Sequence, residues 1–128
     1  MSKEIEYLST EDLLGLAVHL FGDPPPTRDI GLLSSAAARP GTKVFGSESY
    51  ISIWDKASAL LDSVVNNHSL IDGNKRLGWM SCAVFLEING IDTTNTANNL
   101  IYDLVIKVAD SKLEVNEISK ELESIVLA

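Results

Sequence analysis

The chain has 128 residues, with 10 lysines and arginines against 18 aspartates and glutamates, which gives a formal net charge of −8 at pH 7. This length predicts a single domain, residues 1–128, and a hydrophobic content of 45% is enough to form a globular core. So negative a chain is not expected to bind nucleic acid or anionic membranes generally, because such binding needs many lysines and arginines. Any anion that this protein binds must therefore be held by a local site.

Further classes of protein are excluded by short features of the sequence. The single cysteine, Cys82, allows neither an internal disulfide nor a zinc site built from cysteines. The first residues are acidic and lack the basic and then apolar order of a signal peptide. The longest strongly apolar run, residues 79–86, is too short to cross a bilayer. We therefore expect a cytoplasmic protein with no membrane contact.

The first third of the chain predicts two helices and one extended segment. Ser9 is typical of an N-cap, apolar residues follow at helical spacing, and Gly22 ends this helix. A second helix is expected over residues 29–38. The next segment has β-type residues beside glycines, and we expect an exposed extended loop or a small hairpin, the only candidate strand in the chain. This segment, here called the flap, consists of Thr42, Lys43, Val44, Phe45 and Gly46.

The rest of the chain predicts helices only. A long helix is expected over about residues 48–65, because apolar residues recur there every three or four positions. A loop follows, and residues 74–88 form a helix whose second half is apolar on most sides, so we expect it at the centre of the core. Two more helices contain residues 100–108 and 118–126. The expected fold class is all-α, with the flap as a short β-like excursion before the long third helix.

One segment, residues 68–76, gathers side chains that could act on a phosphate. His68 can carry a proton near neutral pH, and the carboxylate of Asp72 could bind a hard cation such as Mg²⁺. Gly73 lets the backbone approach an anion closely. Asn74, Lys75 and Arg76 fall at the expected start of a helix, where unpaired N–H groups and the helix dipole favour a phosphate. Together these parts could position and transfer a phosphoryl or nucleotidyl group.

An ordinary structural interpretation of the same residues is also open. Asp72, Gly73 and Asn74 have the composition of a common turn, and Lys75 and Arg76 could be a solvated pair of cations. The order of all these residue types at a junction between a loop and a helix favours the catalytic interpretation.

Residues 68–76 resemble the signature loop of the Fic/Doc family, which reads His-x-x-x-Asp-Gly-Asn and continues with Gly-Arg in Fic enzymes or Lys-Arg in Doc toxins. The resemblance is dense from Arg28 to Arg76. The family implies a compact helical bundle. The flanking blocks are similar to the Doc ("death on curing") branch, and they comprise residues 28–36, 39–40, 45–46, Tyr50 and 56–57.

Three departures from the Fic pattern bear on the expected chemistry. Ser69 and Leu70 replace the Pro-Phe that often follows the histidine, and Leu70 can still anchor the loop in the core. Lys75 stands where adenylyltransferases have Gly, and Trp79 stands at the position of their second Arg. The resemblance to Doc therefore implies that ATP presents its γ-phosphate. A Fic-type adenylyltransferase, and a binding module without catalytic activity, are the alternatives.

The family resemblance implies a role for each loop residue. His68 would be the general base on a Ser or Thr hydroxyl of a target protein, and Asp72 would hold Mg²⁺. Gly73, Asn74, Lys75 and Arg76 would bind the phosphates of ATP. The flap, residues 42–46, would dock the target as an added strand. The family's target for Doc is elongation factor Tu, whose phosphorylation arrests translation.

The resemblance also implies a protein inhibitor. Self-inhibited Fic proteins carry a Ser/Thr-x-x-x-Glu-Gly/Asn motif. In this chain Ser2 and Glu6 are followed by Tyr7, and Ser119 and Glu123 by Ser124, so neither pair completes the motif. An active protein would then need an inhibitor in trans. We therefore expect a Phd-type antitoxin as partner, with a segment that folds on this chain.

Overall fold

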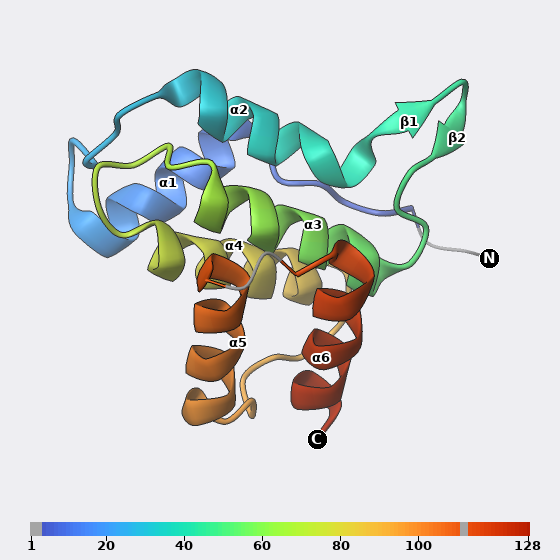
Figure 1. The fold of residues 1–128 in the computed structure, drawn as a ribbon. Helices are drawn as coiled ribbons and strands as arrows, with labels where there is room; N and C mark the ends of the chain where they lie inside the picture. Colours follow the sequence, from blue (N-terminus) through green and yellow to red (C-terminus); the bar gives the residue numbers. More distant parts are fainter. Residues whose placement is uncertain (1–3, 111–112) are drawn as a thin grey trace.

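The computed structural model describes residues 4–110 and 113–128. Within these residues the chain forms six α-helices, one 3₁₀ turn and one two-stranded antiparallel sheet (Figure 1), so the all-α fold class is confirmed. None of the described helices is long and apolar enough to cross a membrane. In chain order the elements are α1 (Thr10–Phe21), α2 (Ile30–Ala38), η1 (Arg39–Gly41), β1 (Lys43–Val44), β2 (Ser47–Glu48), α3 (Ile53–Asn66), α4 (Asn74–Ile88), α5 (Asn98–Asp110) and α6 (Val115–Leu127).

Helix α3 is the most enclosed element of the molecule. It packs against α2 and η1, against α4, and against α5 and α6, which lie below it in Figure 1. Nine of its residues are buried, whereas α4 buries one face that includes Cys82 and Phe85. The expectation that α4 lies at the centre of the core is therefore correct only for that face, because α3 is the helix at the centre of the core. The two helices approach closely at Gly78, where a Cβ would lie 2.5 Å from Cγ2 of Val65.

The helix starts show which boundaries the sequence predicts well. At α1 the prediction is confirmed, because Ser9 Oγ accepts from the N–H of Asp12 at 3.1 Å and the Asp12 carboxylate accepts from the N–H of Ser9 at 2.8 Å. The expected start of the long helix near residue 48 was wrong. Helix α3 begins at Ile53, because Ser52 Oγ accepts from the N–H of Asp55 at 3.0 Å and caps it there.

Residues 43–48 form a hairpin. The sequence had left a small hairpin and an exposed extended loop as the two alternatives for the flap. β1 and β2 pair in the register Lys43 with Glu48 and Val44 with Ser47. Phe45 and Gly46 form the turn with positive φ values of 50° and 81°, as tight hairpins require. The hairpin, residues 43–48, thus extends past the flap to Glu48, where the long helix was expected to begin, and residues 49–52 connect it to α3.

Candidate active site

The loop between α3 and α4 holds His68 in an uncommon backbone conformation. Its φ of 55° lies in the left-handed region, where histidine is tolerated better than most residues. The carbonyl of His68 accepts a hydrogen bond from Arg28 Nε at 2.9 Å, and the carbonyl of Ser69 accepts from the N–H groups of Arg28 and Asp29 at 2.8 and 3.0 Å. The chain entering α2 therefore fixes the backbone at His68 and leaves its side chain exposed to solvent.

Leu70 and Asn74 close the loop on itself. The side chain of Leu70 is buried, as expected of the residue that anchors the loop in the core. The side-chain amide of Asn74 binds the backbone of Leu70 twice, because its oxygen accepts from the Leu70 N–H and its nitrogen donates to the Leu70 carbonyl, both at 3.0 Å. The N–H of Ile71 donates to the carbonyl of Pro26 at 2.7 Å. Asn74 thus shapes the loop, and its backbone N–H lies at the first position of α4.

Gly73 occupies a position that other residues would enter only with strain. Its φ of 93° is left-handed, and a Cβ on this residue would collide with the ring of Phe21, at the end of α1. The guanidinium carbon of Arg76 lies 5.3 Å from the centre of the same ring. Phe21 therefore supports both Gly73 and Arg76, in a geometry typical of a cation–π contact.

The start of α4 carries no side-chain cap, unlike the starts of α1, α2 and α3, which Ser9, Asp29 and Ser52 cap with their side chains. The first N–H groups of a helix have no partner within the helix. At α4 they are accompanied by the exposed side chains of Lys75 and Arg76, with no acidic residue in the first turn. This end of the helix is consequently suited to bind an anion.

A cleft of about 480 Å³ brings the loop residues together. The predicted residues His68, Asp72, Gly73, Asn74, Lys75 and Arg76 all line it. The remaining walls come from the end of α3, from Ile71 and from the end of α5. Asp110 of α5 lines the cleft too, and nothing in its sequence neighbourhood marks it as a residue of this site.

The carboxylate of Asp72 is the predicted metal ligand. One of its oxygens accepts from the N–H of Gly73 at 2.9 Å, and the residue is exposed at the cleft. Among residues 4–110 and 113–128, no group of three or more His, Cys, Asp or Glu side chains is arranged to hold a metal ion. One carboxylate fits a Mg²⁺ ion that takes its other ligands from phosphates and water.

The flap lies away from the cleft. Figure 1 shows the hairpin at one end of α3 and the loop that contains His68 at the other end, and no flap residue lines the cleft. The side chain of Phe45 at the turn is fully exposed. A target protein that uses both the flap and His68 must therefore extend along α3.

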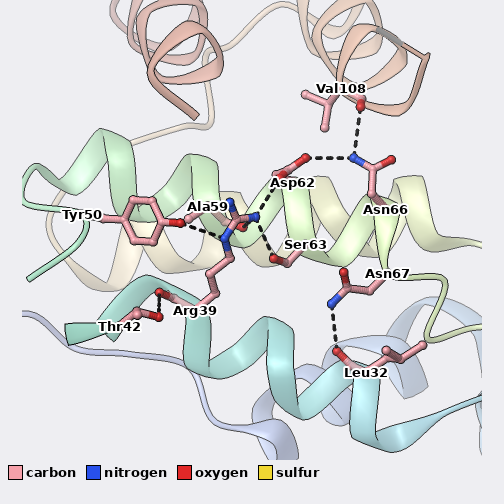
Figure 2. A network of polar contacts seen from close by, with 10 residues as sticks. All are labelled: Leu32, Arg39, Thr42, Tyr50, Ala59, Asp62, Ser63, Asn66, Asn67 and Val108. Atoms are coloured by element: carbon pink, nitrogen blue, oxygen red, sulfur yellow. Dashed lines mark hydrogen bonds and ion pairs between the residues drawn. The ribbon is translucent and has the colours of Figure 1, made fainter. Parts of the chain in front are cut away.

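Polar contacts fasten the base of the hairpin to α3 (Figure 2). Arg39 donates to the Tyr50 hydroxyl at 3.0 Å, to the carboxylate of Asp62 at 2.7 Å and to Ser63 Oγ at 3.0 Å. Burial works to lower the pKa of Arg39, but the hydrogen bonds to Asp62 and Tyr50 outweigh it, so this pKa is raised above its ordinary value. Arg39 therefore stays charged and joins the chain on both sides of the hairpin to α3.

An apolar groove of about 580 Å³ adjoins the cleft and is lined by residues of α1, α4 and α5. Lys75 and Arg76 line both the groove and the cleft. The groove continues along α4 past Trp79, Met80 and Ala83. A molecule bound in this groove would thus touch the cations at the start of α4.

Besides Asp110, sequence reasoning missed two contributors to the site, Phe21 and Pro26. Both lie about fifty residues before the loop, so no local pattern links them to it. Arg28 and Asp29 were seen only through the family resemblance. The side chain of Arg28 donates to the His68 carbonyl, which explains an arginine there, and the side chain of Asp29 caps α2.

Comparisons with known proteins agree with these features. A family model described as the Fic/DOC family matches residues 7–86, a range that includes the flap, α3 and the loop. A relative from Mycolicibacterium smegmatis named "Toxin Doc" is 40% identical over 124 residues, which span 96% of this chain and 95% of that protein. Since the model matches more than half of the chain and the relative matches nearly all of it, the chain belongs to the Fic/Doc family.

Proposed function

We propose that this protein is the toxin of a toxin–antitoxin pair, and that it acts in the cytoplasm as a protein kinase that transfers the γ-phosphate of ATP to a Ser or Thr hydroxyl. Membership of the family and the relative named "Toxin Doc" support this. The observation that carries it is the cleft in which His68, Asp72 and the uncapped start of α4 meet.

In the proposed reaction, the phosphates of ATP bind at the start of α4. Gly73 gives them access to the backbone, Asn74 contributes its N–H, and Lys75 and Arg76 supply positive charge. Lys75 stands where adenylyltransferases have Gly, and this favours transfer of phosphate over transfer of AMP.

His68 acts as the general base on the target hydroxyl. As His68 takes the proton, the hydroxyl oxygen forms a bond to the γ-phosphorus. The bond from that phosphorus to the bridging oxygen of ADP breaks, and ADP leaves. Mg²⁺, held by Asp72 and by ATP, neutralises phosphate charge when it is bound.

Intact-mass measurement of elongation factor Tu, the proposed target, after incubation with this protein and Mg-ATP tests the proposal. We expect a gain of one phosphate. A gain of one AMP would instead identify an adenylyltransferase, and an unchanged mass for this and all other candidate targets would favour a binding module.

The two histidines of the chain provide a matched pair of variants for this assay. His68→Ala is expected to reduce transfer by about 10²- to 10⁴-fold, the usual contribution of a general base. His19→Ala removes an exposed histidine from the last turn of α1 and should leave transfer unchanged. Full activity of a folded His68→Ala protein would contradict the assigned role.

We further propose that a Phd-type antitoxin places a segment in the apolar groove. Such a segment would cover Lys75 and Arg76, because these two residues line the groove and the cleft alike. Ala83→Arg, which fills the groove with a charged side chain, should weaken antitoxin binding measured by calorimetry. Unchanged binding would place the antitoxin elsewhere.

A further inference from the structure

Asp110 lines the cleft together with His68 and the start of α4, but the proposed reaction does not use it. It is the last residue of α5, and it is exposed. The carboxyl end of a helix carries a partial negative charge, so an acidic residue there is unfavourable to the helix itself. Lys107, the basic residue of the same last turn, pairs with Glu121 of α6 and not with Asp110. The stability of α5 therefore does not explain an aspartate at this position.

Asn66 fastens the end of α5 beside the cleft. It is the last residue of α3, and it lines the cleft as well. Its Nδ2 donates to the Val108 carbonyl of α5 at 3.1 Å and to the carboxylate of Asp62 at 2.9 Å. Asp62 in turn accepts from Arg39, as Figure 2 shows. The side chain of Val108 is buried in the core. These contacts hold the last turn of α5 against α3, and they place Asp110 at the cleft.

The cleft has walls of opposite charge. Lys75 and Arg76 supply positive charge at the start of α4, whereas Asp110 and the carboxyl end of α5 supply negative charge. Because a carboxylate repels a phosphate, the phosphates of ATP are expected at the first wall, and the second wall is left to a group of another kind. A carboxylate forms strong hydrogen bonds with a cation, above all with the planar guanidinium of an arginine. The end of α5 is therefore suited to a lysine or arginine side chain.

A hydroxyl that reaches His68 has to enter the same cleft, so its neighbours in the target protein meet the walls of the cleft. We propose that Asp110, held in place by Asn66, is a specificity-determining residue that binds a lysine or arginine side chain next to the modified hydroxyl. This rests on the proposed function, from which it takes the protein substrate. The preferred substrates are consequently Ser or Thr residues with a basic neighbour, whereas an acidic neighbour would be repelled by Asp110.

Two capped peptides test the proposal through binding alone, without ATP or Mg²⁺. One peptide has an arginine on each side of its single serine, and the other has glutamines in place of these arginines. In NMR titrations of the protein, the Kd of the arginine peptide should be about five-fold lower, which is the upper range for an ion pair open to solvent. Asp110→Asn should remove this preference, whereas Asp103→Asn, at an exposed acidic residue of α5 that does not line the cleft, should retain it. Asn66→Ala should reduce the preference, since the end of α5 then loses a hydrogen bond.

Kinetics with the target protein give a second measurement. Asp110→Asn should raise the KM for that protein by about the same factor, with kcat unchanged and ATP bound no more weakly. Equal binding of the two peptides by the wild-type protein overturns the proposal, as does a preference that persists in Asp110→Asn. A loss of ATP affinity in Asp110→Asn with an unchanged KM for the target would assign the carboxylate to the nucleotide, and it also overturns the proposal. If the wild-type protein phosphorylates no target, the proposed function fails, while the peptide titrations still decide whether Asp110 binds a basic side chain.

Discussion

Helices α3 and α4 begin with opposite chemistry, although they lie side by side in the same bundle. At α3, the hydroxyl of Ser52 accepts from the first turn, Asp55 adds an acidic group, and the cation Lys56 is buried and paired. At α4, a glycine replaces the cap and the cations of the first turn are exposed. The start of α3 is capped by a side chain of the protein, whereas the first N–H groups of α4 remain available to an anion.

The difference suggests where an acidic protein would hold the phosphate that the proposed function requires. The net charge of −8 repels anions at long range, but that repulsion is screened over about 8 Å in physiological salt. Within the cleft, the N–H groups of α4 and the side chains of Lys75 and Arg76 supply positive potential beside the carboxylates of Asp72 and Asp110. We therefore expect the local arrangement, and not the net charge, to determine where an anion binds.

The largest effect is expected at Gly73, the residue that leaves the start of α4 open. Gly73→Ala places a Cβ against the ring of Phe21 at a positive φ. We expect ATP affinity to fall more than ten-fold and the free energy of unfolding to fall by about 1–3 kcal/mol. Calorimetry with ATP and chemical denaturation measure these quantities.

Gly90 provides the control at the other end of α4. It has a φ of +92° but no atom within 4 Å of an added Cβ. Gly90→Ala should therefore reduce stability through backbone strain alone and leave ATP affinity unchanged. Equal losses of ATP affinity in both variants would show that the open start of α4 has no special role.

The local sequence was sufficient to predict those parts of the fold and site that depend on near neighbours. The N-cap at Ser9, the loop before Asn74 and the burial of Leu70 are all confirmed. Each depends on contacts between residues close together in the sequence, or on the burial of one apolar side chain.

Features that depend on tertiary contacts were not predictable in this way. Tyr50 fits the apolar period of α3, yet it lies before the helix, where its carbonyl accepts from Lys56 and its hydroxyl accepts from Arg39. Periodicity reports which residues are apolar, and it cannot show that the segment between β2 and α3 is not helical. The support of Gly73 by Phe21 joins residues far apart in the chain, and no pattern in a single sequence marks such a pair.

The cations at the two helix starts should respond differently to neutralisation. Arg76→Gln is expected to lower ATP affinity by about ten- to hundred-fold. This corresponds to the loss of one hydrogen bond to a charged group, which contributes about 1.5–3 kcal/mol. Stability should fall by no more than about 1 kcal/mol, through the lost contact with Phe21. Lys120→Gln, at an exposed lysine of α6, is the control for net charge. An equal loss of affinity in Lys120→Gln would attribute the effect to net charge.

Lys56→Met should show the reverse pattern. The Tyr50 carbonyl loses its donor and Glu48 loses its partner, so the free energy of unfolding should fall by about 1–3 kcal/mol. ATP affinity should not change, since Lys56 lies at the opposite end of α3 from the cleft. Denaturant unfolding and calorimetry on the same protein distinguish the two results, and a loss of ATP affinity would contradict the contrast between the helices.

The smallest effect is expected at Ser52, the cap of α3. Ser52→Ala removes the acceptor for the Asp55 N–H, which costs about 1 kcal/mol of stability in comparable helices. Because Ser52 also lies where the hairpin ends and α3 begins, the first turn should fray and hydrogen exchange there should accelerate, while exchange at the start of α4 stays as it is. Gly73→Ser, which offers a cap at α4, would suffer the strain of a positive φ and the collision with Phe21 before its hydroxyl could accept any bond. A cap can thus be removed from α3 at small cost but cannot be added to α4, so the loop conformation that brings His68 and Asp72 to the cleft also requires an open helix start.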